Sequence, residues 1–237
     1  MTKPIIIITG ATAGIGKALS FAFAKENCHL GLCARTLSDL EELEKAIREE
    51  RADIDIHIQT VDVSDKSAIT AFAEAIQKKW GRVDVLINNA GIFLPGSLLE
   101  EPDGHFEQTM ETNMYSAYHM TRAFYPLLQK EGEKKHIFNM CSIASITAYP
   151  NGGTYAISKW AMLGFNNCLR SELKDSPIRV TALLPGATWS RSWEGAELPE
   201  NRLMKAEDIA QMVLAAWKLP ANATVEEIVI RPQKGDL

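Results

Sequence analysis

A tyrosine and a lysine four residues apart, in YAISK at 155–159, have the spacing for acid–base chemistry. Residues at i and i+4 of a helix lie on the same face, so Tyr155 and Lys159 are expected to be neighbours. A free tyrosine has a pKa of about 10, which is too high for proton transfer at neutral pH. A nearby ammonium group would favour the phenolate and lower that pKa. The alternative is that Tyr155 only packs one face of an amphipathic helix.

A second chemical signal is the glycine-rich turn TGATAGIG at 9–16, between an apolar run and a helical pattern. The N–H groups and positive end of a helix that begins at such a turn bind phosphate. A nucleoside triphosphate P-loop requires GxxxxGK followed by Ser or Thr. Here Gly10 and Gly16 are one residue too far apart, and Ala18 follows Lys17, so the hydroxyl that binds Mg²⁺ is missing. The remaining interpretations are a site for the pyrophosphate of a dinucleotide and a purely structural turn.

Strand-like and helix-like patterns alternate along the chain and place these residues. The strand patterns cover 4–9, 29–34, 54–63, 83–89, 136–142, 178–185 and 225–232. The helix patterns cover 14–26, 36–50, 65–80, 104–130, 154–174 and 206–219, with an interruption expected near Pro126. This alternation predicts an α/β fold with a doubly wound, parallel seven-stranded sheet and helices on both faces. The sequence has no linker or repeat, which predicts a single domain over residues 1–237.

Composition excludes several classes of function. The chain has 237 residues and a net charge of −5, without the basic face that nucleic acid requires. No apolar run reaches the roughly 18 residues of a membrane span, and no signal peptide is recognisable. The cysteines form no CxxC pair, so we expect reduced thiols in a cytoplasmic protein and no metal site. They are Cys28, Cys33, Cys141 and Cys168.

Four further motifs follow successive predicted elements: NNAG at 88–91, Asn113 in ETNMYS, Ser142 in MCSIAS, and YAISK at 155–159. With the glycine turn, this ordered set resembles the short-chain dehydrogenase/reductase family, in its compact single-domain branch. The resemblance runs from residue 5 to about residue 232. It implies a Rossmann-type NAD(P)-binding domain that transfers a hydride between nicotinamide and a carbonyl or alcohol carbon.

The resemblance also assigns roles to single residues. Tyr155 would donate the proton during reduction, Ser142 would bind the substrate oxygen, and Asn113 would hold a water in a proton relay to Lys159. The positive oxidised nicotinamide would act with Lys159 to favour the phenolate and lower the pKa of Tyr155. Asp62 would face the adenine, although a turn or helix cap is an alternative role for it. The implied cofactor-binding residues are Gly10, Thr12, Ala13, Gly14, Ile15, Gly16, Arg35, Asp62, Val63, Asn89, Ala90, Gly91, Tyr155, Lys159, Pro185, Gly186 and Thr188.

The end of the second strand indicates which nicotinamide cofactor is used. NAD-specific sites usually have an acidic residue there, about 20 residues after the glycines, to hold the ribose 2′-hydroxyl. Here Ala34 and Arg35 stand at that position. A guanidinium can bind a 2′-phosphate, so we predict NADP(H) rather than NAD(H). A solvated surface charge is the alternative for Arg35, and Ala13 lacks the second basic residue that many NADP-binding relatives carry.

The segment 187–205 is expected to cover the substrate through Trp189 and Trp193, unless these rings only pack the loop. PGATWSRSW and the C-terminal sequence resemble bacterial sepiapterin-reductase-like members, which reduce carbonyl side chains on pterins. Asp236 could then accept hydrogen bonds from pterin amino groups. The alternatives are a dehydrogenase of serine-type 3-hydroxy acids and a non-catalytic NADP(H)-binding regulator; a sugar-nucleotide epimerase would need a further domain.

The partners expected are a small carbonyl or alcohol substrate and further copies of the chain. Family members usually associate through the helices that here cover 104–130 and 154–174, so we expect a homodimer or a homotetramer. No nucleic acid or membrane partner is expected.

Overall fold

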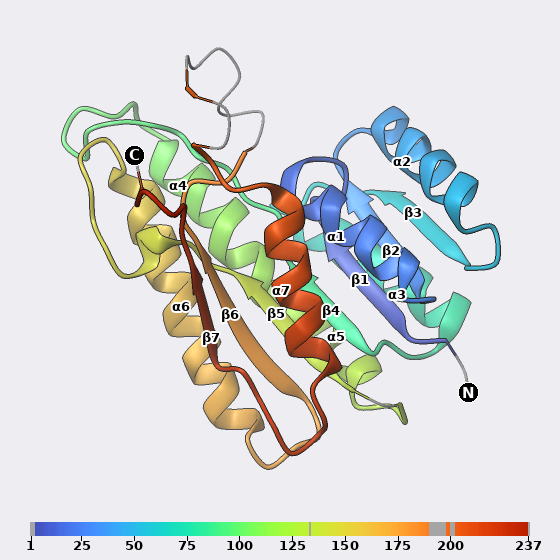
Figure 1. Ribbon diagram of the computed structural model, residues 1–237. Coiled ribbons are helices and arrows are strands. Elements are labelled where there is room, and N and C mark those ends of the chain that lie inside the picture. Colours follow the sequence, from blue (N-terminus) through green and yellow to red (C-terminus); the bar gives the residue numbers. More distant parts are fainter. Residues whose placement is uncertain (1–2, 133, 190–197, 200–201, 237) are drawn as a thin grey trace.

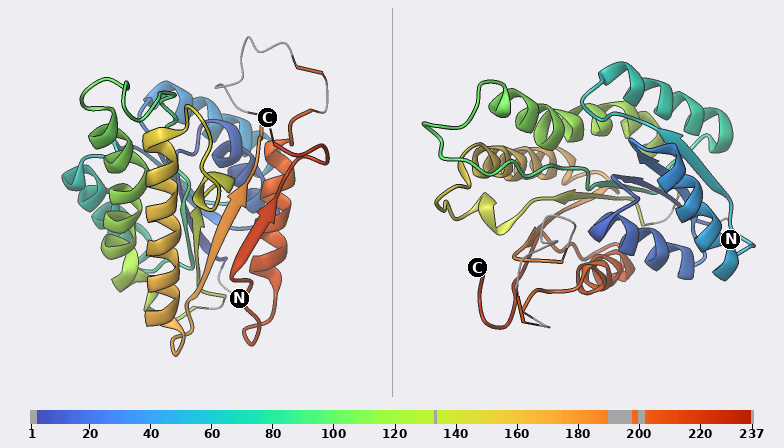
Figure 2. Two further views of the ribbon diagram at one scale, coloured as in Figure 1. Left: turned by 90° about the vertical axis from the view of Figure 1, so that its left-hand side faces the viewer. Right: turned by 90° about the horizontal axis from the view of Figure 1, so that it is seen from above.

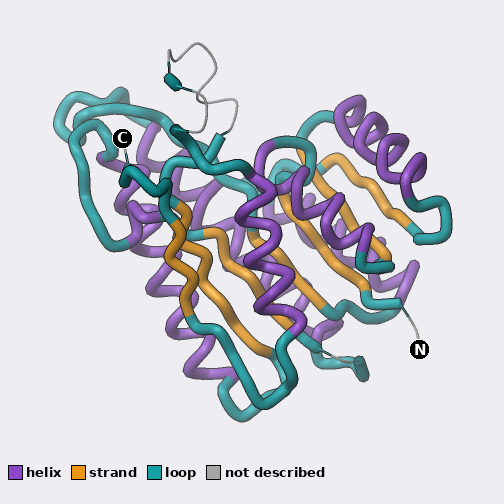
Figure 3. Tube along the Cα trace, in the orientation of Figure 1, coloured by secondary structure: helices purple, strands orange, loops and turns teal. Residues whose placement is uncertain are grey.

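The sheet is the centre of the fold. The computed structural model describes residues 3–132, 134–189, 198–199 and 202–236. Within them seven parallel strands form one sheet in the order β3-β2-β1-β4-β5-β6-β7 (Figures 1 and 3). The strands are β1 (Ile5–Thr9), β2 (His29–Ala34), β3 (Ile56–Thr60), β4 (Val85–Asn88), β5 (His136–Met140), β6 (Arg179–Pro185) and β7 (Glu227–Ile230). The order reverses between β1 and β4, which confirms the predicted doubly wound α/β fold.

Helices cover both faces of the sheet, as the two views in Figure 2 show. The helices are α1 (Gly14–Lys25), α2 (Leu37–Glu50), α3 (Lys66–Trp80), α4 (His105–Met110), α5 (Ser116–Leu128), α6 (Gly153–Leu173) and α7 (Ala206–Lys218). Helices α1, α2 and α7 pack on one face, while α3, α5 and α6 pack on the other. Each layer therefore has its own apolar core.

The first strand shows why its sequence is apolar throughout. Side chains alternate between the two faces of a strand. Ile6 and Ile8 belong to the core under α1 and α7, whereas Ile5 and Ile7 belong to the core under α3 and α5. A parallel strand covered on both sides thus has no polar face.

The long helical stretch at 104–130 departs from the prediction. The expected interruption near Pro126 is wrong, because Pro126 lies in the last turn of α5. The departure is instead a π-helical turn at Glu111–Tyr115, between α4 and α5. It contains the predicted site residue Asn113, and such turns are frequent at functional sites.

Two expectations concern the cysteines and the membrane. All four cysteines are free thiols, and burial raises the pKa of Cys28, Cys33 and Cys141 to about 12. Among the helices that the structure describes, none is long and apolar enough to cross a bilayer.

Candidate active site

A cleft of about 800 Å³ opens at the carboxyl ends of the strands, where doubly wound sheets bind ligands. Most predicted site residues line it: Gly10, Thr12, Ala13, Gly14, Ile15, Arg35, Asp62, Val63, Asn89, Ala90, Gly91, Ser142, Tyr155, Lys159, Pro185, Gly186, Thr188 and Trp189. Gly16 and Asn113 do not line it. Trp193 lies outside the described residues.

The glycine turn is shaped by two different requirements, a positive φ and close packing. Gly10 and Gly14 have φ values of +62° and +48°, which favour glycine. A Cβ on Gly16 would overlap the carbonyl oxygen of Gly10 and lie 2.6 Å from Asn89 Nδ2. Gly16 therefore lets α1 approach β1 closely, and the N-terminus of α1 faces the cleft with its free N–H groups.

Thr9 is a site residue that the sequence analysis missed. Its hydroxyl oxygen accepts hydrogen bonds from the backbone N–H groups of Asn89 (3.0 Å) and Ala90 (2.9 Å). Asn89 Nδ2 in turn donates to the carbonyl oxygens of Thr9 (2.8 Å) and Gly10 (3.2 Å). These bonds join the glycine turn to the NNAG segment and fix the floor of the cleft.

Arg35 and Asp62 lie at the end of the cleft reached by β2 and β3. Arg35 is exposed and lines the cleft. Asp62 Oδ1 accepts hydrogen bonds from the Ser64 hydroxyl (2.7 Å) and backbone N–H (3.0 Å). These bonds, assisted by the charge of Arg35, lower the pKa of Asp62. Asp62 thus stabilises a turn, which was the alternative role expected for it, and it also lines the cleft.

Tyr155 and Lys159 lie one turn apart on α6, as predicted. Lys159 Nζ is 5.7 Å from the centre of the Tyr155 ring and donates to the carbonyl oxygen of Met140 (2.7 Å). Burial lowers the pKa of Lys159 to about 8. Burial raises the pKa of Tyr155, and a hydrogen bond with Ser142 opposes this rise. Lys159 by itself therefore does not lower the pKa of Tyr155, because desolvation of the phenolate outweighs the favourable contacts. The lowering that we expect from Lys159 together with a positive oxidised nicotinamide stays a prediction.

Asn113 joins the π-helical turn to the cleft wall. Its Oδ1 accepts from the backbone N–H of Ile92 (2.7 Å). Its Nδ2 donates to the carbonyl oxygen of Ile92 (3.0 Å) and to Ser158 Oγ (2.9 Å). Both amide hydrogens are thus committed, so the side chain could bind a water only by accepting from it. A Cβ on Gly91 would lie 3.2 Å from Asn113 Oδ1 and 3.6 Å from Lys159 Nζ, so glycine permits their approach.

Ser142 occupies the turn that follows β5. It has an extended backbone and precedes a 3-10 turn at Ile143–Ser145. Its Oγ accepts from the backbone N–H of Ala144 (3.1 Å), and its hydroxyl also contacts Tyr155. The serine is thus held by its own turn in contact with the phenol.

Aromatic rings line the outer part of the cleft. Phe93 lies edge-to-face against Tyr155 with 5.1 Å between ring centres, although 41% of Phe93 is exposed. Tyr149 and Trp189 also line the cleft and are exposed. Phe93 and Tyr149 were missed in the sequence, although the apolar pair that follows NNAG was a possible signal. Asp236 lines the cleft too, and its Oδ1 accepts from the Ala187 backbone N–H (3.2 Å).

Comparison with known proteins decides the family. The family model described as short chain dehydrogenase matches residues 4–200. The chain belongs to this family. The sepiapterin reductase of Chlorobaculum tepidum is 33% identical over 243 residues, which cover 99% of this chain and 98% of that protein. The match confirms the predicted family and makes the chain an oxidoreductase that acts between CH–OH and C=O groups.

Two solved structures of this short-chain dehydrogenase fold are also similar. An alcohol dehydrogenase from Thermococcus sibiricus, complexed with 5-hydroxy-NADP, has a TM-score of 0.90 and 27% identity, covering 100% of this chain and 99% of that one. The serine dehydrogenase of Escherichia coli has a TM-score of 0.80 and 26% identity, covering 95% of this chain and 96% of that one.

Proposed function

We propose that the chain is an NADP(H)-dependent reductase of carbonyl compounds, folded as a single domain over residues 1–237. The observation that carries the proposal is the meeting of Tyr155, Ser142 and Lys159 in the cleft that the glycine turn also lines. The cleft offers the cofactor a helix N-terminus for its pyrophosphate and a cation beyond β2. The nicotinamide supplies the hydride when it is bound.

The side chains of the cleft would supply the proton transfer and the binding of the substrate oxygen. The raised pKa of Tyr155 keeps its phenol protonated at neutral pH, as a proton donor to a carbonyl oxygen must be. Ser142, in contact with that phenol, would hold the same oxygen. Lys159 and Asn113 would return a proton to Tyr155 from solvent. A positive nicotinamide beside Tyr155 would favour the phenolate in the oxidation direction.

Arg35 supports NADP(H), as does the NADP analogue in the Thermococcus sibiricus structure. A guanidinium–phosphate hydrogen bond contributes about 1.5–3 kcal/mol. Arg35→Leu should therefore lower the ratio of kcat/KM for NADPH to that for NADH by roughly 10- to 100-fold. Lys17→Leu is the matched control, since Lys17 is an exposed cation in the first turn of α1 but does not line the cleft. A wild-type preference for NADH would contradict the assignment.

The substrate class is best supported as a neutral carbonyl compound of the pterin type. The support is the similarity to a sepiapterin reductase and the aromatic lining of Phe93, Tyr149 and Trp189. A serine-type 3-hydroxy acid is the alternative, because the cation of Arg231 lines the cleft. However, Asp236 Oδ2 lies 3.4 Å from Arg231 Nε and would repel a substrate carboxylate.

A substrate screen distinguishes these possibilities. NADPH absorbance would be followed with sepiapterin and diketones, and NADP⁺ reduction with L-serine. We expect reduction of sepiapterin or a diketone and little oxidation of L-serine. Oxidation of L-serine alone would favour the dehydrogenase. NADPH binding without turnover of any compound would favour a regulator.

We also propose that the chain forms a homodimer or homotetramer through α4, α5 and α6. With the π-helical turn between α4 and α5, these helices expose large apolar side chains: Phe106, Tyr115, Tyr118, Ile157 and Trp160. Such patches mark protein interfaces. Light scattering of the purified chain should give two or four times the monomer mass, and a monomer at micromolar concentration would contradict the proposal.

A further inference from the structure

The C-terminal tail returns from β7 to the cleft and is held there by its backbone. The Arg202 guanidinium donates to the carbonyl oxygens of Gly235 (2.8 Å) and Asp236 (3.0 Å). Gly235 has φ +80°, which lets the chain turn toward the cleft at this point. Because other atoms anchor the tail, the Asp236 carboxylate is available for the turn that follows β6.

That carboxylate fits closely against the Pro185–Thr188 turn. Oδ1 accepts the Ala187 backbone N–H at 3.2 Å, while Oδ2 lies 3.4 Å from Arg231 Nε. A Cβ built on Gly186 would overlap Asp236 Oδ1. Gly186 thus leaves the space that the carboxylate fills.

Main-chain partners hold most of the rest of the turn, and the Thr188 hydroxyl donates to the carbonyl oxygen of Gly186 (2.9 Å). Gly186 N–H donates to the carbonyl oxygen of Ile230 (2.8 Å), and Trp189 N–H donates to that of Met204 (2.8 Å). Met204 N–H donates to the carbonyl oxygen of Ala187 (3.0 Å). Between these anchors, the Ala187 N–H donates to the Asp236 side chain, which lies in the tail beyond the carboxyl end of β7. The turn's shape at Ala187 therefore depends on Asp236.

We propose that Asp236 is a positioning residue for the cofactor. Its carboxylate fixes the Gly186–Thr188 turn, which lines the cleft with Tyr155 and which the family resemblance assigns to cofactor binding. The inference rests on the proposed function, because it assigns that part of the cleft to NADP(H). It also gives Asp236 a role that requires no contact with substrate.

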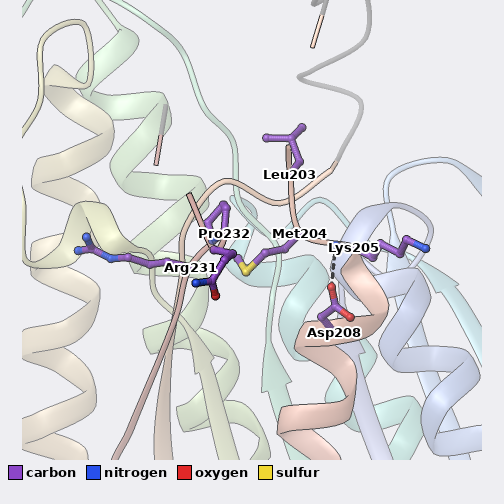
Figure 4. Close-up of a pocket in the computed structure, with 7 residues that line it drawn as sticks. Leu203, Met204, Lys205, Asp208, Arg231 and Pro232 are labelled. Atoms are coloured by element: carbon purple, nitrogen blue, oxygen red, sulfur yellow. Dashed lines mark hydrogen bonds between the residues drawn. The ribbon is translucent and has the colours of Figure 1, made fainter. Parts of the chain in front are cut away.

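A neighbouring hollow supplies a matched control (Figure 4). This hollow of about 320 Å³ lies beside the start of α7, and Arg231 lines both it and the cleft. In it, Asp208 Oδ2 accepts the Lys205 backbone N–H at 2.9 Å. Asp208 makes the same kind of bond as Asp236 but does not line the cleft.

The first test measures NADPH binding by fluorescence titration, together with the unfolding midpoint. Asp236→Ala should raise the NADPH Kd about tenfold, since one charge-assisted hydrogen bond is lost. Asp236→Asn keeps an oxygen for the Ala187 N–H and should recover most of that loss. Asp208→Ala should leave the Kd within about twofold, even if its unfolding midpoint falls. An unchanged Kd in Asp236→Ala would overturn the proposal, as would an equal rise in Asp208→Ala.

The second test asks whether Gly186 and Asp236 are coupled. Gly186→Ala should weaken NADPH binding more in the wild-type background than in Asp236→Ala, where the overlapping carboxylate is gone. Equal effects in the two backgrounds would overturn the proposal. NADPH binding with this pattern, but no reduction of any carbonyl, would contradict the proposed chemistry alone. A chain that binds no NADPH would contradict both.

Discussion

At the scale of single residues, one buried lysine stabilises the fold and another destabilises it. Lys135 Nζ lies 2.9 Å from the Asp84 carboxylate, so its charge has a buried counter-ion. Lys159 is also buried, but the bond it makes is to the neutral carbonyl of Met140. Burial lowers the pKa of Lys159 from its usual 10.5 to about 8. The folded state therefore bears an ammonium group that destabilises it, at a position where we propose that it serves catalysis.

The Lys159 prediction follows from the sign of this shift. Between pH 8 and 10.5 the unfolded chain binds the proton that the folded chain has lost, so the Lys159 contribution to stability rises with pH. At pH 7 the penalty is present in full. Lys159→Met should therefore stabilise the fold by about 2 kcal/mol, because the free-energy penalty of the buried charge is larger than the contribution of the hydrogen bond that is lost. The variant should also abolish turnover.

Urea unfolding at pH 7 and at pH 10 measures the difference between wild type and Lys159→Met. The advantage of the variant should shrink at the higher pH. Lys135→Met is the matched control and should destabilise by about 2 kcal/mol, because buried Asp84 loses one of its two counter-ions and keeps Arg82. A Lys159→Met variant less stable than wild type at pH 7 would contradict the assignment of the buried charge.

At the scale of elements, the helical stretch at 104–130 shows which features a local sequence pattern predicts and which it does not. Its length and apolar face were evident in the sequence, as was the position of Asn113 within it. The π-helical turn was not, because Asn113 is held there by Ile92 and Ser158, which are remote in sequence. The interruption was predicted at Pro126 because proline disrupts helices, but Pro126 lies in the last turn of α5.

Arg179 is a second feature that only the assembled elements reveal. It is buried at the start of β6 and donates hydrogen bonds to four backbone carbonyl oxygens at and beyond the end of α7: those of Ala216, Trp217, Leu219 and Ala223. The last carbonyls of a helix have no partner within it, and a cation near them is favourable. Arg179 thus joins α7 to the sheet.

Arg179→Met should lower the free energy of unfolding by about 3 kcal/mol, because buried carbonyl groups lose their donor. Denaturant unfolding measures this loss. Arg48→Met on α2 removes only an exposed pair with Glu44 and should change stability by less than about 0.5 kcal/mol. Equal losses in the two variants would show that Arg179 does not serve as the proposed cap.

At the scale of the whole molecule, the parallel seven-stranded sheet and the residues that line the cleft followed from the sequence, because their signals are periodic or glycine-specific. Buried parallel strands appear in the sequence as apolar runs, and three of the five motifs, the glycine turn, NNAG and Ser142, lie where β1, β4 and β5 end. The return of the tail to the cleft could not be predicted, since Gly186 and Asp236 are 50 residues apart and neither belongs to a periodic pattern. The raised pKa of Tyr155 was also missed, because burial depends on the complete fold.

The central claim is that Tyr155 donates the proton for carbonyl reduction by NADPH in this cleft. Single-turnover oxidation of bound NADPH by the best carbonyl substrate, compared in wild type and Tyr155→Phe, tests it most directly. We predict rapid oxidation by wild type and a rate at least about 100-fold lower in the variant, with the NADPH Kd unchanged within about twofold. Equal rates in the two proteins would contradict the claim.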